Sequence, residues 1–193
     1  MNLQKVNPCA VAVTAQERRC ADLEDIFARC FFDDYATRLL AAPVEPLYLP
    51  AVQPGECHRI FYLEGHFSSA LHEVAHWCIA GPRRRLCEDY GYWYVPDGRS
   101  AAEQRRFEQV EVRPQALESV FAQGCAHRFH ISADNLQGAI GPDSRFAGAV
   151  REQVDAFGRL GLPHRAATFY RALCRYYGTS ERYVGRSRGV ELS

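Results

Sequence analysis

The chain has 193 residues, of which 47% are hydrophobic and 12% aromatic, enough apolar material for one folded domain with a sizeable core. Its 23 Lys and Arg residues balance 23 Asp and Glu residues, so no overall charge favours a nucleic acid or an anionic membrane as partner. No apolar run reaches the length of a membrane span, and the N-terminal residues lack the apolar core of a signal peptide. The eight cysteines include no Cys-x-x-Cys pair, so we expect a cytoplasmic protein with reduced thiols.

The N-terminal part of the chain predicts two helices separated by short strands. Apolar residues recur at helical spacing over residues 14–32. Two short runs of aromatic and aliphatic residues, 47–49 and 59–63, predict strands. The serines at 68–69 then offer a cap for a helix over residues 69–80. We expect the second strand to deliver the chain directly to this helix.

The helix over residues 69–80 contains a His-Glu-x-x-His motif, formed by His72, Glu73 and His76. Four residues are slightly more than one helical turn, so the two imidazoles stand on one face and can bind a single metal ion. Glu73 follows the first histidine and can act as a general base or as an outer-shell hydrogen-bond acceptor. The alternative is a pair of core histidines that are satisfied by hydrogen bonds on a helix that only packs. The apolar pattern around the motif favours a buried metal site.

Two runs of unusual composition follow this helix. The first, residues 83–85, is three consecutive arginines, which are either a solvated face or a contact for an acidic partner. The second, residues 90–94, holds four aromatic side chains and precedes a Pro-Asp-Gly turn signal. Such a cluster either joins the core or walls a substrate pocket beside the metal helix.

A long helix that begins after Ser100 is the expected source of a third metal ligand. Pro114 lies inside this helix and should kink or restart it, because proline has no amide donor. One side of the helix carries an apolar stripe that consists of Phe107, Val110, Pro114, Leu117 and Phe121. Beside it runs a polar stripe that consists of Glu108, Glu111, Gln115 and Glu118. This polar stripe is either a ligand source or a solvated acidic face.

The choice of third ligand lies between Glu108 and Glu111, which are neighbours on this stripe. In metallopeptidases with a His-Glu-x-x-His motif, a later helix commonly supplies a glutamate ligand, and a polar residue four positions on supports a ligating histidine. Glu111 and Gln115 have this spacing, whereas Glu108 is followed at that distance by Val112, which cannot accept a hydrogen bond. We therefore favour Glu111 as the ligand, with Gln115 and Glu108 as supporting groups.

The rest of the chain predicts a strand over residues 128–132 and two further helices, the last of them opened by Pro163. Taken together, the elements indicate an α+β fold, in which a single, mainly helical domain over residues 1–193 has a small sheet and the metal helix at its core. The chain ends, 1–14 and 186–193, are expected to be flexible.

Two histidines and one carboxylate suit two different chemistries. Zinc bound by this set, with Glu73 as general base, hydrolyses peptide bonds. Ferrous iron in a facial set of two histidines and one carboxylate uses dioxygen to hydroxylate carbon. A third alternative is a binding module with a structural zinc and Cys78 as a ligand, although Cys78 points away from the histidine face. The ligand types alone leave these alternatives open.

Several nearly contiguous motifs allow a comparison with known families. They are residues 31–34, 66–67, 72–81, 89–94, 96–99, 107–112, 114–117 and 134–136. Together they resemble the bacterial elongation factor P hydroxylase family, and the resemblance extends over about residues 23–177. Its long motifs are more specific than His-Glu-x-x-His alone.

The resemblance implies a non-haem, metal-dependent oxygenase of metalloprotease-like ancestry, with Fe(II) held by His72, His76 and Glu111 and dioxygen as co-substrate. It implies that the partner is elongation factor P, whose lysine is hydroxylated after it has received a β-lysyl group. Glu73 would then be an outer-shell group beside the iron. A pocket for so long and positively charged an arm should carry acidic and aromatic groups. Our candidates for these groups are Asp89, Tyr92, Trp93 and Asp97.

Overall fold

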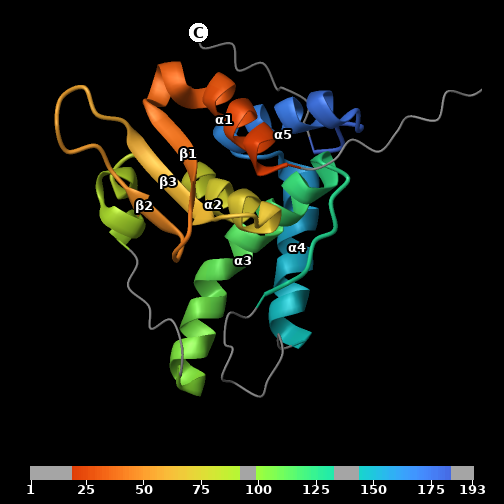
Figure 1. Ribbon diagram of the computed structural model, residues 1–193. Coiled ribbons are helices and arrows are strands. Elements are labelled where there is room, and N and C mark those ends of the chain that lie inside the picture. The colour runs from red at the N-terminus through yellow and green to blue at the C-terminus, as the bar shows by residue number, and fades with distance from the viewer. Residues whose placement is uncertain (1–18, 92–98, 133–143, 184–193) are drawn as a thin grey trace, which may run out of the picture.

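Figure 1 shows the computed structural model, which describes residues 19–91, 99–132 and 144–183. A small sheet lies on one side, and helices make up most of the described chain (Figure 1). The motif helix, α2 (Phe67–Ile79), packs against both the sheet and the longest helix. This mainly helical arrangement with a small sheet confirms the expected α+β fold class. In the described part of the chain, no helix is both long and apolar enough to cross a membrane.

The sheet has three strands in the order β1-β3-β2, with β3 at its centre. β1 (Thr37–Ala42) runs parallel to β3 (His58–Leu63), and β2 (Leu47–Leu49) runs antiparallel to it. β2 and β3 confirm the two predicted strands. β1 was not predicted, because its sequence Thr-Arg-Leu-Leu-Ala-Ala contains only one β-branched residue and ends in two alanines.

α1 (Cys20–Tyr35) packs on β1 and on α2 through an apolar face. Its buried apolar residues recur at spacings of three and four, as expected for a helix: Leu23, Ile26, Phe27 and Phe31. The rings of Phe27 and Phe31 lie 5.1 and 4.8 Å from the ring of Trp77 in α2. The predicted helix over residues 14–32 is thus present from Cys20 onward, and its first residues lie outside the described chain.

α2 begins at Phe67, two residues earlier than expected, and the predicted serine cap is wrong. The N-cap residue is His66, whose side chain makes no capping hydrogen bond. Ser69 instead lies in the first turn of the helix, where its hydroxyl accepts a hydrogen bond of 3.1 Å from the amide of Leu63. Because Leu63 is the last residue of β3, this serine joins the strand to the helix.

The C-terminal end of α2 is capped by a side chain of α5 (His164–Tyr177). Arg165 donates hydrogen bonds to the carbonyls of Trp77, at 2.9 Å, and Cys78, at 3.1 Å, and also to that of Ala80. The last carbonyls of a helix have no amide partner and form the negative end of its dipole, so a guanidinium there is stabilising. Arg165 therefore fixes the end of the motif helix.

α3 (Ala101–Gly124) is the longest helix, and α4 (Ser144–Leu160) and α5 pack on it. As predicted, Ser100 caps it, in a capping box with Glu103. The helix continues through Pro114, so it is not restarted there. The predicted apolar stripe is buried except at Val110, which is 39% exposed.

Residues 128–132 form no strand, so that prediction is wrong. At the end of this segment, Gln115 of α3 makes the hydrogen bonds of Ser132 that a neighbouring strand could have made. Its amide group donates to the carbonyl of Ser132 at 2.6 Å, and its oxygen accepts from the Ser132 amide at 3.2 Å. A side-chain amide thus satisfies both backbone groups of Ser132.

We expect Arg165→Met to lower the free energy of unfolding by about 2 kcal/mol, since three carbonyls lose a charged donor while the aliphatic bulk remains. Urea unfolding followed by circular dichroism would measure the change. Arg171→Met is the matched control, because Arg171 is exposed on the same helix. Equal stabilities of the two variants would contradict a capping role for Arg165.

Candidate metal centre

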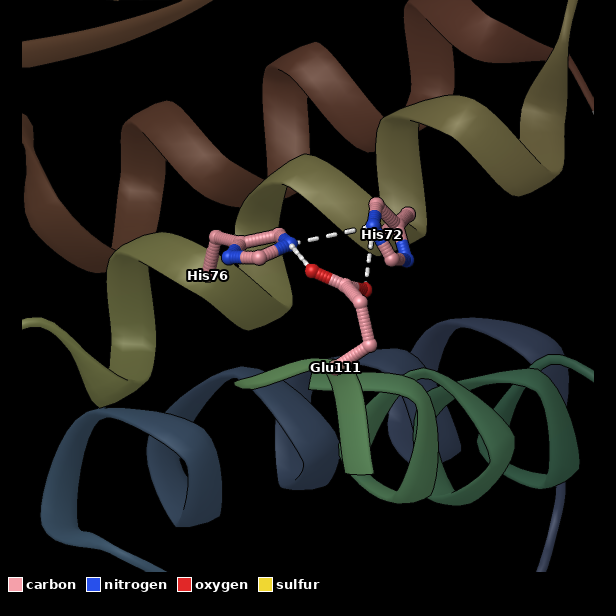
Figure 2. A group of neighbouring side chains, drawn as sticks. All are labelled: His72, His76 and Glu111. Carbon is pink, nitrogen blue, oxygen red and sulfur yellow. Dashed lines mark hydrogen bonds and ion pairs between the residues drawn. The ribbon is translucent and has the colours of Figure 1, made fainter. Parts of the chain in front are cut away.

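Three side chains from two helices converge at the crossing of α2 and α3 (Figure 2). Nε2 of His72 and Nε2 of His76 lie 3.0 Å apart. Oε2 of Glu111 lies 3.4 Å from Nε2 of His72, and Oε1 of Glu111 lies 3.2 Å from Nε2 of His76. Two imidazole nitrogens and one carboxylate thus point at one small volume, and all three ligand atoms lie within 4.8 Å of one another.

The sequence places these groups by simple helical geometry. His72 and His76 are four residues apart on α2, so both face α3. Glu111 lies on the buried side of α3 and is only 3% exposed. Among the described residues, these three form the one group of histidine, cysteine, aspartate or glutamate side chains that could hold a metal ion.

A second carboxylate of α3 orients one of the histidines. Glu118 lies 2.9 Å from Nδ1 of His72 and is 7% exposed. When Nδ1 donates its hydrogen to this carboxylate, Nε2 keeps its lone pair and points toward His76 and Glu111. Glu118 was not among the predicted supporting residues, although it is seven residues from Glu111 and therefore on the same face of the helix.

Neither of the two predicted supporting residues makes a hydrogen bond to a histidine of the cluster. Gln115 bonds to the backbone of Ser132, although it also helps to hold the carboxylate of Glu111. Glu108 accepts a hydrogen bond of 3.1 Å from Gln104 one turn earlier in α3 and does not join the cluster. The spacing of four from Glu111 therefore predicted a buried polar residue, Gln115, but the residue that contacts His72 is Glu118, one turn further along α3.

Of the four predicted substrate-binding residues, the structure describes only Asp89. Its carboxylate accepts a hydrogen bond of 2.8 Å from the amide of Tyr48, which joins β2 to the 3-10 turn η2 (Glu88–Gly91). Asp89 is also close enough to Glu73 and His76 for their charges to act on one another. Tyr92, Trp93 and Asp97 lie outside the described residues.

The charges of the cluster shift two pKa values in opposite directions. Burial disfavours the charged form of His72, but its hydrogen bond to Glu118 and the nearby carboxylates outweigh burial and raise the pKa of His72 to about 10. Burial also disfavours charge on Glu111, but His76 and His72 outweigh it and lower the pKa of Glu111 to about 2. The centre therefore attracts positive charge, whether as a proton on His72 or as a cation.

Glu73 lies beside the cluster and is free to act on a bound molecule. It is partly buried, and no group among the described residues makes a hydrogen bond to its carboxylate. Burial raises its pKa, the two histidines oppose this shift, and the charges of Glu111 and Asp89 add to it. The raised pKa makes this carboxyl group a better proton acceptor than an ordinary glutamate.

Tyr90 forms one wall of the centre and was not singled out by sequence reasoning. Its ring stacks on His76, with centroids 6.3 Å apart and planes inclined by 8°, and also on Tyr48, at 4.4 Å and 16°. The backbones of Asp89 and Tyr90 have φ values of +44° and +58°, in the left-handed region that non-glycine residues rarely adopt. This local strain places a buried aromatic ring against a candidate ligand.

Cys78 does not belong to the cluster, which weakens the alternative of a structural zinc site. It is buried, and burial raises the pKa of its thiol well above the usual value. Cys78 also lies outside the group of side chains that could hold a metal among the described residues.

The fold and the site together define the class of the protein: an α+β protein with a candidate mononuclear metal centre of two histidines and one glutamate. The sequence model of the elongation factor P hydroxylase family matches residues 26–186. A curated protein of Haemophilus influenzae, named elongation factor P lysine hydroxylase, is 48% identical over 165 residues, which are 86% of this chain and 93% of that protein. The chain belongs to the elongation factor P hydroxylase family and is an enzyme of the hydroxylase class.

We expect Glu118→Gln to weaken the binding of a divalent metal by about 10- to 100-fold, because an amide orients His72 less strongly than a carboxylate does. Isothermal titration of the metal-free protein with Co²⁺ or Fe²⁺ under nitrogen would measure the affinity. Glu108→Gln is the control and should bind as wild type does, since Glu108 bonds to Gln104. Equal losses in both variants would contradict a specific role for Glu118.

Metal uptake should also depend on pH. The pKa of His72 is raised to about 10, so at neutral pH a metal must displace a proton from this side chain. The affinity is therefore expected to rise with pH, by up to about tenfold per pH unit between about pH 6 and pH 8. Titrations in buffers of different ionisation enthalpy would count the protons released. An affinity that falls as the pH rises would contradict the assignment.

Proposed function

We propose that this protein hydroxylates elongation factor P on a lysine that already carries a β-lysyl group, with Fe(II) as the metal and dioxygen as co-substrate. The observation that carries the proposal is the pairing of a 48% identical relative named elongation factor P lysine hydroxylase with a cluster of two histidines and one glutamate. The relative supports the substrate, and the donor atoms support the metal.

The residues fit a ferrous ion by the chemistry of their donors. Two imidazole nitrogens and one carboxylate are the set typical of non-haem Fe(II) oxygenases. In the described chain, Oε2 of Glu111 is buried and makes no hydrogen bond, although Nε2 of His72 lies 3.4 Å away. A cation bound between these groups would satisfy this oxygen. Bound at this set, Fe(II) would supply the redox chemistry by which dioxygen hydroxylates carbon.

The protein side of the reaction is to orient ligands, to exclude water and to hold protons. Glu118 fixes the ring of His72, and Tyr90 packs against the ring of His76. Glu73 stands beside both histidines with a carboxyl group that no described side chain or amide occupies, so it can accept a hydrogen bond from a bound substrate or water. The nearby carboxylate of Asp89 adds negative charge, which suits a positively charged lysyl arm.

The main alternative is a zinc peptidase in which Glu73 is the general base. The same three ligands suit Zn²⁺, so the donor set alone does not separate the two functions. Membership of the hydroxylase family favours the oxygenase. The two functions differ in the metal that supports turnover, in the need for dioxygen and in the product.

The test is a reaction of Fe(II)-loaded protein with β-lysylated elongation factor P, dioxygen and an added two-electron reductant, which reduces the second oxygen atom to water. Mass spectrometry of the modified peptide follows. Wild-type protein should add one oxygen atom only when air is present, and His72→Ala should abolish both the reaction and metal binding. Glu73→Gln should retain iron but lose about 10- to 100-fold in rate, because an outer-shell carboxylate has been removed. Zinc-dependent cleavage of a peptide that disappears in Glu73→Gln, without any hydroxylation by wild type, would establish the peptidase instead.

A further inference from the structure

A cleft of about 820 Å³ opens beside the candidate metal centre. It lies between the end of α2 with the residues that follow it and the middle of α3, and His76 forms part of its wall. His76 therefore belongs both to the wall of the cleft and to the candidate metal centre. A protein that sits in the cleft would lie next to the metal centre.

The rim of the cleft is basic. Arg83 and Arg84 line it on one side and Arg113 lines it on the other, and no acidic residue of the described chain contributes to its lining. Arg83 and Arg113 are exposed, and neither forms an ion pair with a described residue. Arg84 donates a hydrogen bond of 3.4 Å to the carbonyl of Tyr90, which holds its position next to the centre.

The metal centre beside the cleft carries the opposite charge. Glu111 and Glu118 are buried at the centre, and Glu73 and Asp89 lie beside it, so four carboxyl groups surround the two histidines. The chain as a whole has no net charge, so this separation into an acidic interior and a basic rim is local. It is complementary to a ligand with a positive arm that projects from a negative surface.

We infer that the arginine-lined cleft docks an acidic surface of the protein substrate, at the base of the lysyl arm that enters the metal centre. This inference rests on the proposed function, because that function supplies a protein substrate with a cationic arm. The lysyl arm itself cannot bind at the rim, because the positive charge of the arm and those of the arginines repel one another. The exposed side chain of Val110, beside Pro82 and Pro114, adds an apolar floor that such a contact would cover.

The arginine triplet of residues 83–85 thereby divides into different roles. Arg83 faces solvent at the rim, and Arg84 is anchored to Tyr90. The guanidinium of Arg85 turns to the opposite side, where it lies 5.2 Å from the ring centroid of Tyr35 and 5.8 Å from that of Trp77. The docking surface is therefore built from Arg83 and Arg113, with Arg84 at its inner edge.

The test compares the double variant Arg83→Glu/Arg113→Glu with wild type and with Arg171→Glu, which reverses an exposed charge on α5. Figure 1 shows α5 at the opposite end of the molecule from the N-terminal half of α3. Binding to β-lysylated elongation factor P is measured directly by fluorescence anisotropy, and hydroxylation by mass spectrometry. Metal content and thermal unfolding establish that the variants are folded and loaded.

The double variant should raise both Kd and KM by about tenfold or more while kcat and metal content stay within about twofold of wild type. Wild-type affinity should fall with added salt, and the double variant should lose most of this dependence. Arg171→Glu should match wild type in every measurement. The neutral variant Arg83→Gln/Arg113→Gln should lie between wild type and the charge reversal.

A double variant that binds elongation factor P as wild type does, with the same salt dependence, would overturn the docking surface even if hydroxylation is confirmed. Conversely, binding that is lost in the double variant although wild type hydroxylates nothing would support the surface and reject the proposed reaction. Loss of binding to a single-stranded RNA, with unchanged affinity for elongation factor P, would also overturn the inference and assign the cleft to nucleic acid.

Discussion

Two buried carboxylates of α3 face the two imidazoles of α2, and this opposition of charges sets the geometry of the molecule. Glu111 is 3% exposed and Glu118 is 7% exposed. A carboxylate taken out of water costs several kcal/mol unless partners replace its hydration. His72 and His76 are those partners, so the two helices must cross where these four side chains meet. The convergence of two nitrogens and one carboxylate therefore stabilises the contact between the two helices and is also a candidate ligand set.

The remaining contacts of α2 prevent the helix from shifting out of this register. Ser69 joins its first turn to the end of β3, and Arg165 binds the carbonyls of its last turn. Trp77 lies against Phe27 and Phe31 of α1 on the side away from α3. Three independent parts of the chain thus hold a helix of 13 residues, which is the kind of rigid support that a metal site needs.

Sequence reasoning predicted the parts of this site that depend on helical periodicity. The spacing of His72 and His76, and the position of Glu111 on the same stripe as Glu118, follow from 3.6 residues per turn. What it missed depends on long-range contacts. β1 is a strand because it pairs with β3, the backbone of Ser132 bonds to the side chain of Gln115 and not to a strand, and Tyr90 reaches His76 through a left-handed turn. Secondary-structure propensity and hydrophobic periodicity contain no information about which distant residues will pair with a segment.

Pro114 gives the cleft a chemical group that no side chain provides. It lies within α3, where its missing amide leaves the carbonyl of Val110, four residues earlier, without the donor that helix geometry would assign to it. Both residues line the cleft. This main-chain carbonyl therefore lacks its i+4 donor within the helix and can accept a hydrogen bond from an amide. Because it belongs to the backbone, mutation of Val110 would not remove this acceptor, whereas replacement of Pro114 by any other residue would restore the helical bond and withdraw it.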